Sequence, residues 1–413
     1  MTDRIAIIGA GLAGLCCARE LAARGLACTV YEASDAVGGR VRTDVVDGFR
    51  LDRGFQVLLT SYPEAARVLD YAALDLRPFD PGARIWTGDR FETIGDPFRQ
   101  PGQAIPTLVA SVGTLADKLR VLRLRQSVTR PPLDALWARP ETTTARALRS
   151  RYGFSERMIE RFFAPFLGGV FLDPALTASS RSFEFYFRMF SLGKATVPNA
   201  GMQAIPEQIA ASLPDGTVQL NRRVTACDGT GLVLDDGDRI DARAVVIAAD
   251  AAAASRLAPS LGAPGWRSTV SLHYAADAPP TDAPVLMLDG TGAGPVNNVQ
   301  VMSAVAPGYA PPGATLITAS VLGAPDASDD ALDAAARRQL DGWFGGQVSR
   351  WHTLPPTRVA HALPSIPSLD PPERPVRLAD GRYVAGDHRR NASINGAMVS
   401  GRHAAEAIAA DLA

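Results

Sequence analysis

The chain has 413 residues, of which 46% are hydrophobic and 21% charged, a composition typical of a globular protein long enough for two or three domains. This composition excludes a disordered or collagen-like chain. Lysine and arginine together number 42 and aspartate and glutamate 43, so the net charge is −1 and gives no general electrostatic reason to expect a nucleic acid as partner.

The cysteines and the apolar stretches bear on metal binding and location. Cys16, Cys17, Cys28 and Cys227 form no CxxC pair, so we expect neither a metal site nor a disulfide framework, and a reducing compartment fits best. The uncharged stretch at 5–18 is too short to span a membrane and lacks the features of a signal peptide. The sequence therefore predicts a cytoplasmic protein. It leaves a peripheral membrane contact open and gives no indication of an oligomeric state.

The N-terminal elements predict a βαβ unit. A β-branched run at Arg4–Ile8 is typical of a strand buried on both faces of a parallel sheet. The glycine-rich turn Gly9–Gly14 follows, then a helix over Leu15–Gly25 and a second strand over Ala27–Tyr31. Strand, tight turn, helix and strand in about thirty residues make one βαβ unit, which opens a doubly wound sheet.

The middle of the chain predicts a helical insertion followed by short strands. Residues 62–200 are rich in arginine, leucine and aromatic residues at helical spacing and are broken by prolines. A further helix is expected over Met202–Leu213. The strands expected after it cover Val218–Val224, Gly231–Asp235 and Arg239–Ile247, and the stretch 244–249 resembles a buried strand of the first sheet.

The last third predicts a second sheet and then a return to the first. We expect a proline-rich connector over Pro355–Pro375, a strand over Arg382–Ala385 and a closing helix over about Asn395–Ala410. The strands of the second sheet are expected at Ser268–Tyr274, Val285–Leu288 and Thr315–Leu322.

These elements predict an α/β fold with two interleaved domains, because the first sheet collects both ends and a central piece of the sequence. One is a Rossmann-like domain and the other a mixed α+β substrate domain. The Rossmann-like domain is expected to comprise residues 1–60, 200–258 and 375–413, and the substrate domain residues 61–199 and 259–374.

Three glycines after the first strand match the dinucleotide fingerprint GxGxxG. Gly9 allows the tight turn, Gly11 lets the backbone approach a pyrophosphate, and Gly14 lets the helix pack on the strand. Leu12 and Ala13 lie at the start of the helix, where free N–H groups and a partial positive charge favour phosphate. The alternative is a glycine-rich turn that only packs a helix against a sheet.

A second motif follows the second strand. Glu32, 18 residues after Gly14, stands where an acid can accept hydrogen bonds from both ribose hydroxyls, although a solvated acid at a strand end is the alternative. It begins the pattern ExxxxxGGRxxT, a second glycine turn with a guanidinium able to contact pyrophosphate. The candidate cofactor contacts in this motif are Glu32, Ala33, Gly38, Gly39, Arg40, Val41 and Arg42.

With this second turn the chain resembles the flavin-containing superfamily of amine oxidases, protoporphyrinogen oxidases and phytoene-desaturase-type enzymes, in which the combination marks FAD. Residues 383–387, YVAGD, and 393–401, SINGAMVSG, look like the closing signature of that superfamily. The resemblance implies that Asp387 holds the ribityl and pyrophosphate side, that 396–398 present N–H groups to the flavin, and that Val224 reads adenine. The candidate contacts added by it are Val224, Gly386, Asp387, Ser393, Ile394, Gly396 and Ala397.

The resemblance implies an FAD-dependent oxidoreductase that transfers a hydride between a substrate C–H bond and flavin N5, with oxygen, a quinone or another electron acceptor completing the cycle. The amine-oxidising branch carries a lysine where this chain has Thr269, and an aromatic residue where it has Ser393. A desaturase-like or saturase-like reaction on a hydrophobic small molecule is therefore favoured. A flavin amine or amino-acid oxidase is the alternative, and a non-redox FAD-containing isomerase or binding protein is the alternative of another class.

The sequence predicts no committed catalytic side chain. His388 is the best-placed histidine, although a loop histidine that only hydrogen-bonds locally is the alternative. The aromatic cluster at 183–190 could line a pocket or form ordinary core. The cations between Lys118 and Arg125 could face a membrane or simply water.

Overall fold

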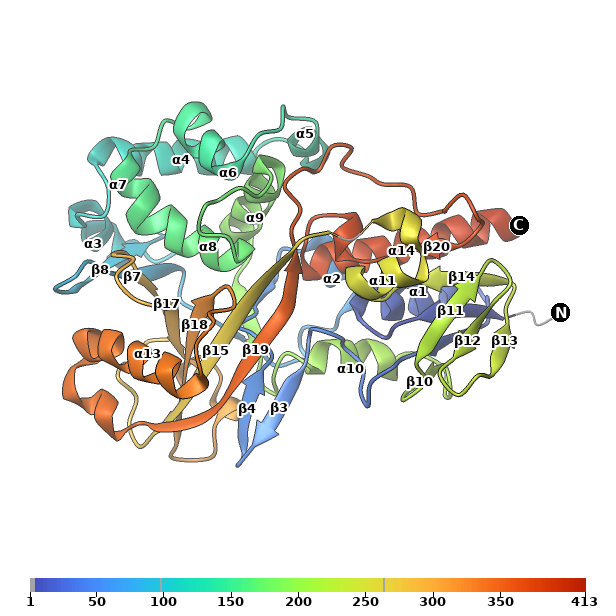
Figure 1. Ribbon diagram of the computed structural model, residues 1–413. Helices are drawn as coiled ribbons and strands as arrows, with labels where there is room; N and C mark the ends of the chain where they lie inside the picture. The colour runs from blue at the N-terminus through green and yellow to red at the C-terminus, as the bar shows by residue number, and fades with distance from the viewer. Residues whose placement is uncertain (1–3, 97–98, 263) are drawn as a thin grey trace.

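The computed structural model describes residues 4–96, 99–262 and 264–413. The molecule is elongated, with the first sheet and both chain ends toward one end and the larger sheet with a group of helices toward the other (Figure 1). The predicted α/β class is confirmed, whereas the domain boundaries stay a prediction.

The first sheet has five parallel strands in the order β10-β2-β1-β14-β20. Its central strand β1 is buried at every residue because helices α1 and α14 cover one face, while α11 and a small antiparallel sheet cover the other. The strands span Ile5–Ile8 (β1), Cys28–Tyr31 (β2), Val218–Gln219 (β10), Ala244–Ile247 (β14) and Tyr383–Val384 (β20). The elements that cover it are Leu12–Ala23 (α1), Ile394–Leu412 (α14), Ala251–Leu257 (α11), Val224–Asp228 (β11), Gly231–Leu234 (β12) and Arg239–Asp241 (β13).

The larger sheet has seven strands in the order β19-β15-β18-β17-β16-β7-β8. One face packs its apolar residues, such as Val270 and Leu272, against Leu332 and Leu340 of helix α13, which spans Asp329–Phe344. The strands span Gly82–Trp86 (β7), Phe91–Gly95 (β8), Trp266–Ala276 (β15), Leu286–Asp289 (β16), Val296–Val301 (β17), Thr315–Leu322 (β18) and His352–Pro364 (β19).

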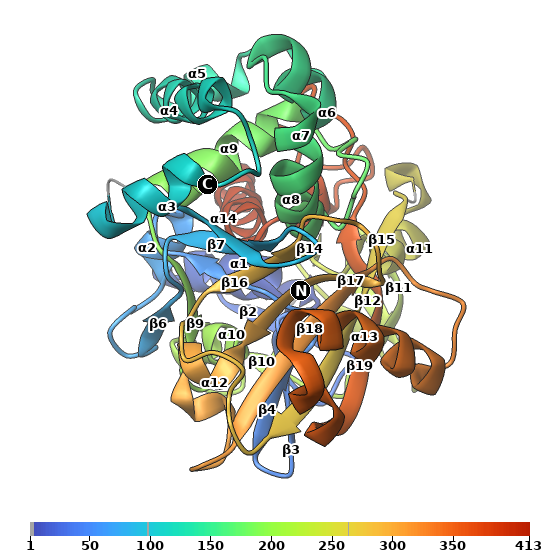
Figure 2. The same cartoon turned by 90° about the vertical axis from the view of Figure 1, so that its left-hand side faces the viewer.

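Helices from the middle of the chain gather over the other side of this sheet (Figures 1 and 2). They span Ala104–Val109 (α3), Leu115–Thr129 (α4), Leu133–Trp137 (α5), Thr144–Arg146 (α6), Glu156–Met158 (α7), Ala164–Phe171 (α8) and Ser180–Leu192 (α9), with π-helical turns at 147–151 and 159–163. The remaining short elements are Thr43–Val46 (β3), Phe49–Asp52 (β4), Leu58–Leu59 (β5), Pro63–Val68 (α2), Leu76–Pro78 (β6), Ala195–Pro198 (β9), Ala204–Ala211 (α10) and Met302–Val305 (α12).

Two of the predicted segments are wrong in part. Residues 62–200 contain strands β6 to β9 besides the helices, and β7 and β8 extend the larger sheet through the parallel pairing of β7 with β16. The expected connector 355–375 begins as strand β19, with Pro355 and Pro356 inside it. Because β19 lies at the edge of the sheet, its outer side has no ladder bonds for proline to remove.

Two other predicted strands are each divided between sheets. The expected strand Val218–Val224 becomes β10 and β11, separated by Asn221 with φ of 55°. The expected strand 239–247 becomes β13 and β14, which belong to different sheets. The chain crosses from one layer to another within four residues in the first case and two in the second, which a continuous run of strand-forming residues does not reveal.

Helix α1 also begins earlier than predicted, at Leu12 instead of Leu15. The predictions for β1, β2, β12, β20 and the closing helix are confirmed to within a few residues. The described elements without a counterpart among the predictions are β3, β4, β5, α11, β17, α12 and α13.

Candidate cofactor and substrate cavity

A cavity of about 1590 Å³ is lined by the carboxyl ends of β1 and β2, by helices of the insertion and by residues of the larger sheet. A pocket for one drug-sized ligand has roughly 300–1,000 Å³. The cavity therefore has room for a dinucleotide and a second molecule. All the predicted cofactor contacts line it except Gly14, Arg42 and Gly396.

The three glycines of the fingerprint have different structural roles. A Cβ on Gly14 would lie 1.9 Å from the carbonyl oxygen of Gly9, so Gly14 is needed for packing. Gly9 has φ of 104°, a conformation that favours glycine. A Cβ on Gly11 would meet no described atom within 4 Å, and its φ is −71°. Gly11 therefore keeps open a space that belongs to the cavity.

The second glycine turn lies against the first. The N–H of Gly38 donates to the carbonyl of Ala10 at 2.9 Å, and Gly39, with φ of 59°, would bring a Cβ to 3.6 Å from the Cα of Gly11. Helix α1 starts here without a side-chain cap and without an acid in its first turn. The two turns form a smooth cradle whose free N–H groups suit an anion such as a pyrophosphate.

Glu32 is held in the cavity wall beside this cradle. Its Oε2 accepts the N–H of Ala10 at 2.7 Å, and its Oε1 accepts the N–H and the hydroxyl of Ser34 at 2.9 and 2.7 Å. Ala33 and Val224 line the same cavity. A carboxylate anchored in this way has lone pairs left for further donors, as ribose hydroxyls would supply.

Arg40 and Asp387 form an ion pair that joins the second glycine turn to the C-terminal motif. The guanidinium lies 2.6 Å from Asp387, donates to the carbonyl of Ala362 at 2.9 Å and lies 5.8 Å from the ring centroid of Trp266. Burial of Asp387 favours its neutral form, but the charge and hydrogen bond of Arg40 outweigh this and hold the pKa of Asp387 below its ordinary value. Arg42 pairs instead with Asp35, outside the cavity lining.

The closing motif forms the start of α14. Ser393 caps this helix by accepting the N–H of Gly396 at 2.8 Å, while Gly386 donates to Ser400 at 3.0 Å. Ile394 and Ala397 line the cavity. Gly396 does not, because a Cβ there would lie 2.1 Å from the carbonyl oxygen of Asn391, so its role is close packing.

The aromatic cluster at 183–190 is partly cavity lining and partly ordinary core, which are the two alternatives given for it above. Tyr186, Phe187 and Phe190 line the cavity, together with Phe162 and Phe166 from the preceding segment. The other members of the cluster, Phe183, Phe185 and Met189, are buried core residues outside the lining. An aromatic wall of this kind excludes water and suits an apolar ligand.

The larger sheet contributes three polar residues to the lining, beside apolar ones such as Leu286, Leu288 and Leu322. Thr269, Asn298 and Ser320 line the cavity from three neighbouring strands. The Nδ2 of Asn298 donates to Ser320 at 3.1 Å and to Gln300 at 3.0 Å, and Thr269 donates to the carbonyl of Val321 at 2.9 Å. The predictions missed Asn298 and Ser320. The alternation of polar and apolar residues in 296–301, VNNVQV, was a signal for a strand with one polar face.

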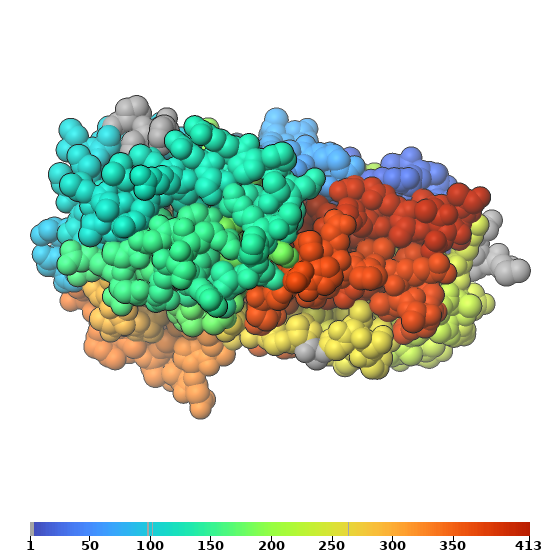
Figure 3. Space-filling view, turned by 90° about the horizontal axis from the view of Figure 1, so that it is seen from above, coloured from blue at the N-terminus to red at the C-terminus, as the bar shows by residue number. Residues whose placement is uncertain are grey.

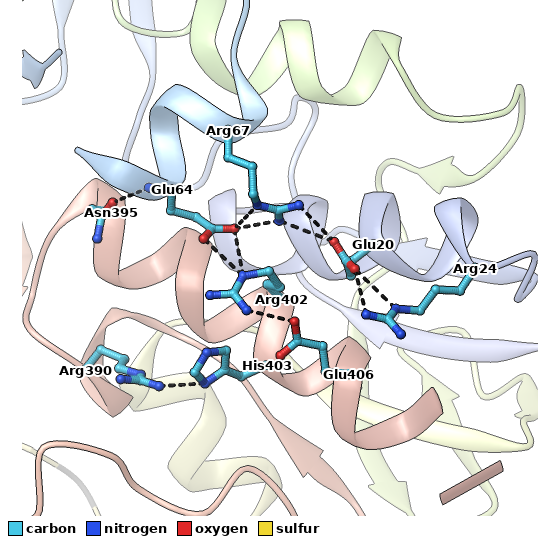
Figure 4. Close-up of polar contacts among 9 residues, drawn as sticks. All are labelled: Glu20, Arg24, Glu64, Arg67, Arg390, Asn395, Arg402, His403 and Glu406. Carbon is cyan, nitrogen blue, oxygen red and sulfur yellow. Dashed lines mark hydrogen bonds and ion pairs between the residues drawn. The ribbon is translucent and has the colours of Figure 1, made fainter. Parts of the chain in front are cut away.

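Beside the cavity, a cluster of ion pairs fixes the short helix α2 (Figure 4). The buried carboxylate of Glu64 pairs with Arg402 of α14 at 3.0 Å and with Arg67 at 2.6 Å. The backbone N–H of Glu64 donates to the side-chain oxygen of Asn395 at 2.9 Å. Tyr62, directly before α2, lines the cavity and stacks on Phe185. The cluster therefore ties a wall residue to the helix whose start lines the same cavity.

His388 is buried and does not line the cavity. Neither ring nitrogen has a hydrogen-bond partner among the described residues, and burial lowers its pKa to about 4. His388 is therefore not positioned for acid–base work in this cavity. Groups of three or more metal-ligating side chains are also absent from the residues that the structure describes.

The glycine cradle, the anchored carboxylate and the parallel sheet define an α/β fold of the dinucleotide-binding class. The family described as flavin containing amine oxidoreductase matches residues 12–409, and the chain belongs to this family. FAD is therefore the cofactor of this family member.

Individual relatives are distant. A coproporphyrinogen III oxidase of Mycobacterium leprae is 30% identical over 194 residues, which are 44% of this chain and only 40% of that protein. A carotenoid phi-ring synthase of Streptomyces griseus is 28% identical over 382 residues, covering 81% of this chain and 73% of that protein. A solved structure of an oxidoreductase from Methanosarcina mazei has a TM-score of 0.77 at 19% identity, covering 98% of this chain and 100% of that chain, and shows the same fold.

Proposed function

We propose that this enzyme introduces or removes a double bond in a hydrophobic small molecule, in the manner of a desaturase or saturase. The observation that carries the proposal is the aromatic wall of Phe162, Phe166, Phe187 and Phe190 in the cavity that also contains the glycine cradle. Thr269 in the cavity lining supports it, because a lysine would be expected there in an amine-oxidising relative.

The chain's own residues would hold FAD along the cradle. Gly11, Gly39 and the start of α1 would receive the pyrophosphate, Glu32 the ribose and Val224 the adenine. The start of α14, at Ser393, Ile394 and Ala397, would lie beside the flavin, where a helix N-terminus stabilises negative charge. When bound, FAD supplies the hydride acceptor or donor.

The rest of the cavity would bind and orient the substrate. The aromatic side chains exclude water and hold an apolar chain, and Asn298 and Ser320 offer hydrogen bonds to a polar end group. The name of the Streptomyces relative, a carotenoid enzyme, supports a hydrophobic polyene as substrate class. Oxygen, a quinone or another acceptor would complete the cycle.

The test is an anaerobic titration of the FAD-containing protein, followed by the visible flavin absorbance. We expect a polyene delivered in detergent to bleach the oxidised flavin band if the enzyme introduces a double bond, or to restore the band of the chemically reduced protein if it removes one, and amines to leave the oxidised band unchanged. Bleaching by an amine would overturn the proposal in favour of an amine or amino-acid oxidase. Turnover without acceptor consumption would instead indicate a non-redox isomerase.

A pair of variants links the reaction to the aromatic wall. Phe166→Ser removes an aromatic side chain that lines the cavity, and the loss of apolar contact should raise the polyene KM at least about tenfold with the flavin spectrum unchanged. Phe344→Ser is the matched control, since Phe344 is half-buried on α13 outside the lining. Equal effects of both changes would contradict this assignment of the substrate site.

A further inference from the structure

Helix α3 is apolar but exposed. Its six residues, AIPTLV, are all described by the structure and none is buried. Ile105 and Val109 are each 74% exposed and Leu108 is 55% exposed. A helix in a water-soluble region normally turns its apolar residues toward a core. Helix α3 has no such core, so its apolar side chains are available to something outside the chain.

Helix α4 continues this exposed surface. Leu115, Leu119 and Leu122 are 64%, 59% and 36% exposed, and their spacing of four and three residues puts them on one stripe of the helix. A different face, with Leu124 and Val128, is buried in the protein. Helix α4 therefore has two apolar faces, one packed against the protein and one exposed.

The two exposed faces belong to one surface, which we call the apolar patch and which comprises Ile105, Leu108, Val109, Leu115, Leu119 and Leu122. The ammonium of Lys118 on α4 donates to the carbonyls of Leu108 and Ala110 at the end of α3, which holds the two helices together. Among the residues that the structure describes, the patch contains six of the nine exposed large hydrophobic side chains. Such clustering marks an interaction surface rather than scattered surface residues.

The patch lies within a basic region. Residues 104–130 contain five lysines and arginines and a single acid, Asp117, although the whole chain has a net charge of −1. Asp117 is buried, accepts hydrogen bonds from Thr114 and Ser155, and pairs with Arg120 at 3.1 Å. Arg123 is exposed, next to Leu122 in sequence, and has no ion pair within the described part of the chain. Apolar side chains interleaved with cations suit a layer of anionic lipid headgroups over acyl chains.

The cavity reaches this surface. Leu122 and Leu192 are exposed at the surface and also line the cavity. Val121 and Arg125 of α4, which are partly buried, line it too. Helices α3 and α4 lie on the outer side of the helical group, away from the first sheet (Figure 1), and form part of the outer surface in the view from above (Figure 3). A ligand that left the cavity beside Leu122 would emerge at the patch.

We propose that α3 and α4 dock the enzyme on the surface of an anionic phospholipid bilayer, with the apolar patch inserted among the headgroups. In the residues described, no helix is both long and apolar enough to cross a membrane, so the contact is peripheral. The further statement that a hydrophobic substrate passes from the bilayer past Leu122 into the cavity rests on the proposed function. The docking itself does not.

Vesicle co-flotation of the FAD-containing full-length protein tests the docking. We expect binding to phosphatidylcholine vesicles that contain phosphatidylglycerol and at least about tenfold weaker binding to pure phosphatidylcholine vesicles. The double variant Val109→Glu, Leu119→Glu should lose binding to both, because two carboxylates replace inserted side chains. Arg123→Ala should weaken only the binding to anionic vesicles, by about fivefold.

Val45→Glu is the matched control, since Val45 is 67% exposed on β3, outside the patch. Its binding should equal that of the wild type, and flavin absorbance of each variant verifies the fold. Absence of vesicle binding, or binding unchanged by the double variant, would overturn the proposal. A dimer in solution that only the double variant dissociates, without vesicle binding, would also overturn it and assign the patch to a second copy. No flavin turnover enters these measurements, so a failed substrate assay leaves the docking result standing.

Discussion

Gly11 is a residue whose geometry bears directly on cofactor binding. Neither its backbone conformation nor a neighbouring described atom requires glycine, because φ is −71° and a Cβ would meet nothing within 4 Å. Gly11→Val should therefore leave the apoprotein as stable as the wild type while weakening FAD binding at least about tenfold, since the side chain enters the cradle. The measurement is FAD titration by fluorescence quenching, with thermal unfolding of the apoprotein alongside.

Gly14→Ala provides the contrast for that experiment. Its added methyl group would lie 1.9 Å from the carbonyl oxygen of Gly9, so this variant should unfold at a lower temperature even without FAD. If Gly11→Val bound FAD like the wild type, the cradle would not be where the pyrophosphate lies.

His388 makes a prediction about pH. Burial lowers its pKa to about 4 from an ordinary 6.5, so the folded state binds fewer protons than the unfolded state between these values. Its neutral form therefore supports folding fully above pH 6.5, and this contribution falls as the pH falls toward 4. At pH 5 the loss is about 2 kcal/mol.

His388→Leu should remove this acid sensitivity, because both ring nitrogens lack partners among the described residues and an apolar side chain leaves nothing unsatisfied. Denaturant unfolding of the apoprotein at pH 7.5 and pH 5 measures it: the variant should lose about 2 kcal/mol less than the wild type between the two pH values. An equal loss in both proteins would show that other groups carry the acid sensitivity.

At the scale of the element, α2 depends on Glu64. Its buried carboxylate is paired with Arg402 of α14 and with Arg67, and removing it would leave Arg402 without its partner on α2. Glu64→Ala should cost about 3 kcal/mol in urea unfolding and should raise the substrate KM, since Tyr62 in the cavity wall loses its anchored neighbour. Arg24→Ala, at an exposed ion pair with Glu20, should cost less than about 0.5 kcal/mol. Equal losses would mean that burial of Glu64 does not matter.

The elements also show which parts of the fold the sequence could predict. The βαβ unit around Gly9–Gly14 was predictable because its strand, turn and helix follow one another and carry their own signals. Asn298 and Ser320 were not, because their place in the cavity wall depends on the pairing of β17 with β18. The strand nature of β19 was hidden by Pro355 and Pro356, which only its edge position tolerates.

The candidate cofactor contacts divide in the same way, into those that a local motif predicts and those that depend on the rest of the fold. Gly11, Glu32 and Asp387 follow from local motifs, and all three line the cavity. Arg42 belongs to the same motif, yet it pairs with Asp35 outside the lining, because the direction of a long side chain depends on charges elsewhere in the fold. A motif therefore identified the turn and its backbone more securely than the side chains around it.

At the scale of the whole molecule, the cavity joins the two sheets. Its wall includes Glu32 after β2 of the first sheet and Thr269 and Ser320 of the larger one, so a bound dinucleotide and substrate would contact both. We expect FAD to raise the free energy of unfolding of the whole molecule in one transition. The linkage relation gives about 2.7 kcal/mol at a free concentration one hundred times the Kd.

Calorimetry of the apoprotein with FAD and with FMN tests this coupling. FMN lacks the adenosine monophosphate half, so it would leave Glu32 and Val224 without a ligand and should stabilise the protein markedly less than FAD at equal concentration. Equal stabilisation by both would mean that the end of the cavity at Glu32 contributes nothing to binding. Separate transitions, of which FAD moved only one, would mean that the cavity does not link the two sheets energetically.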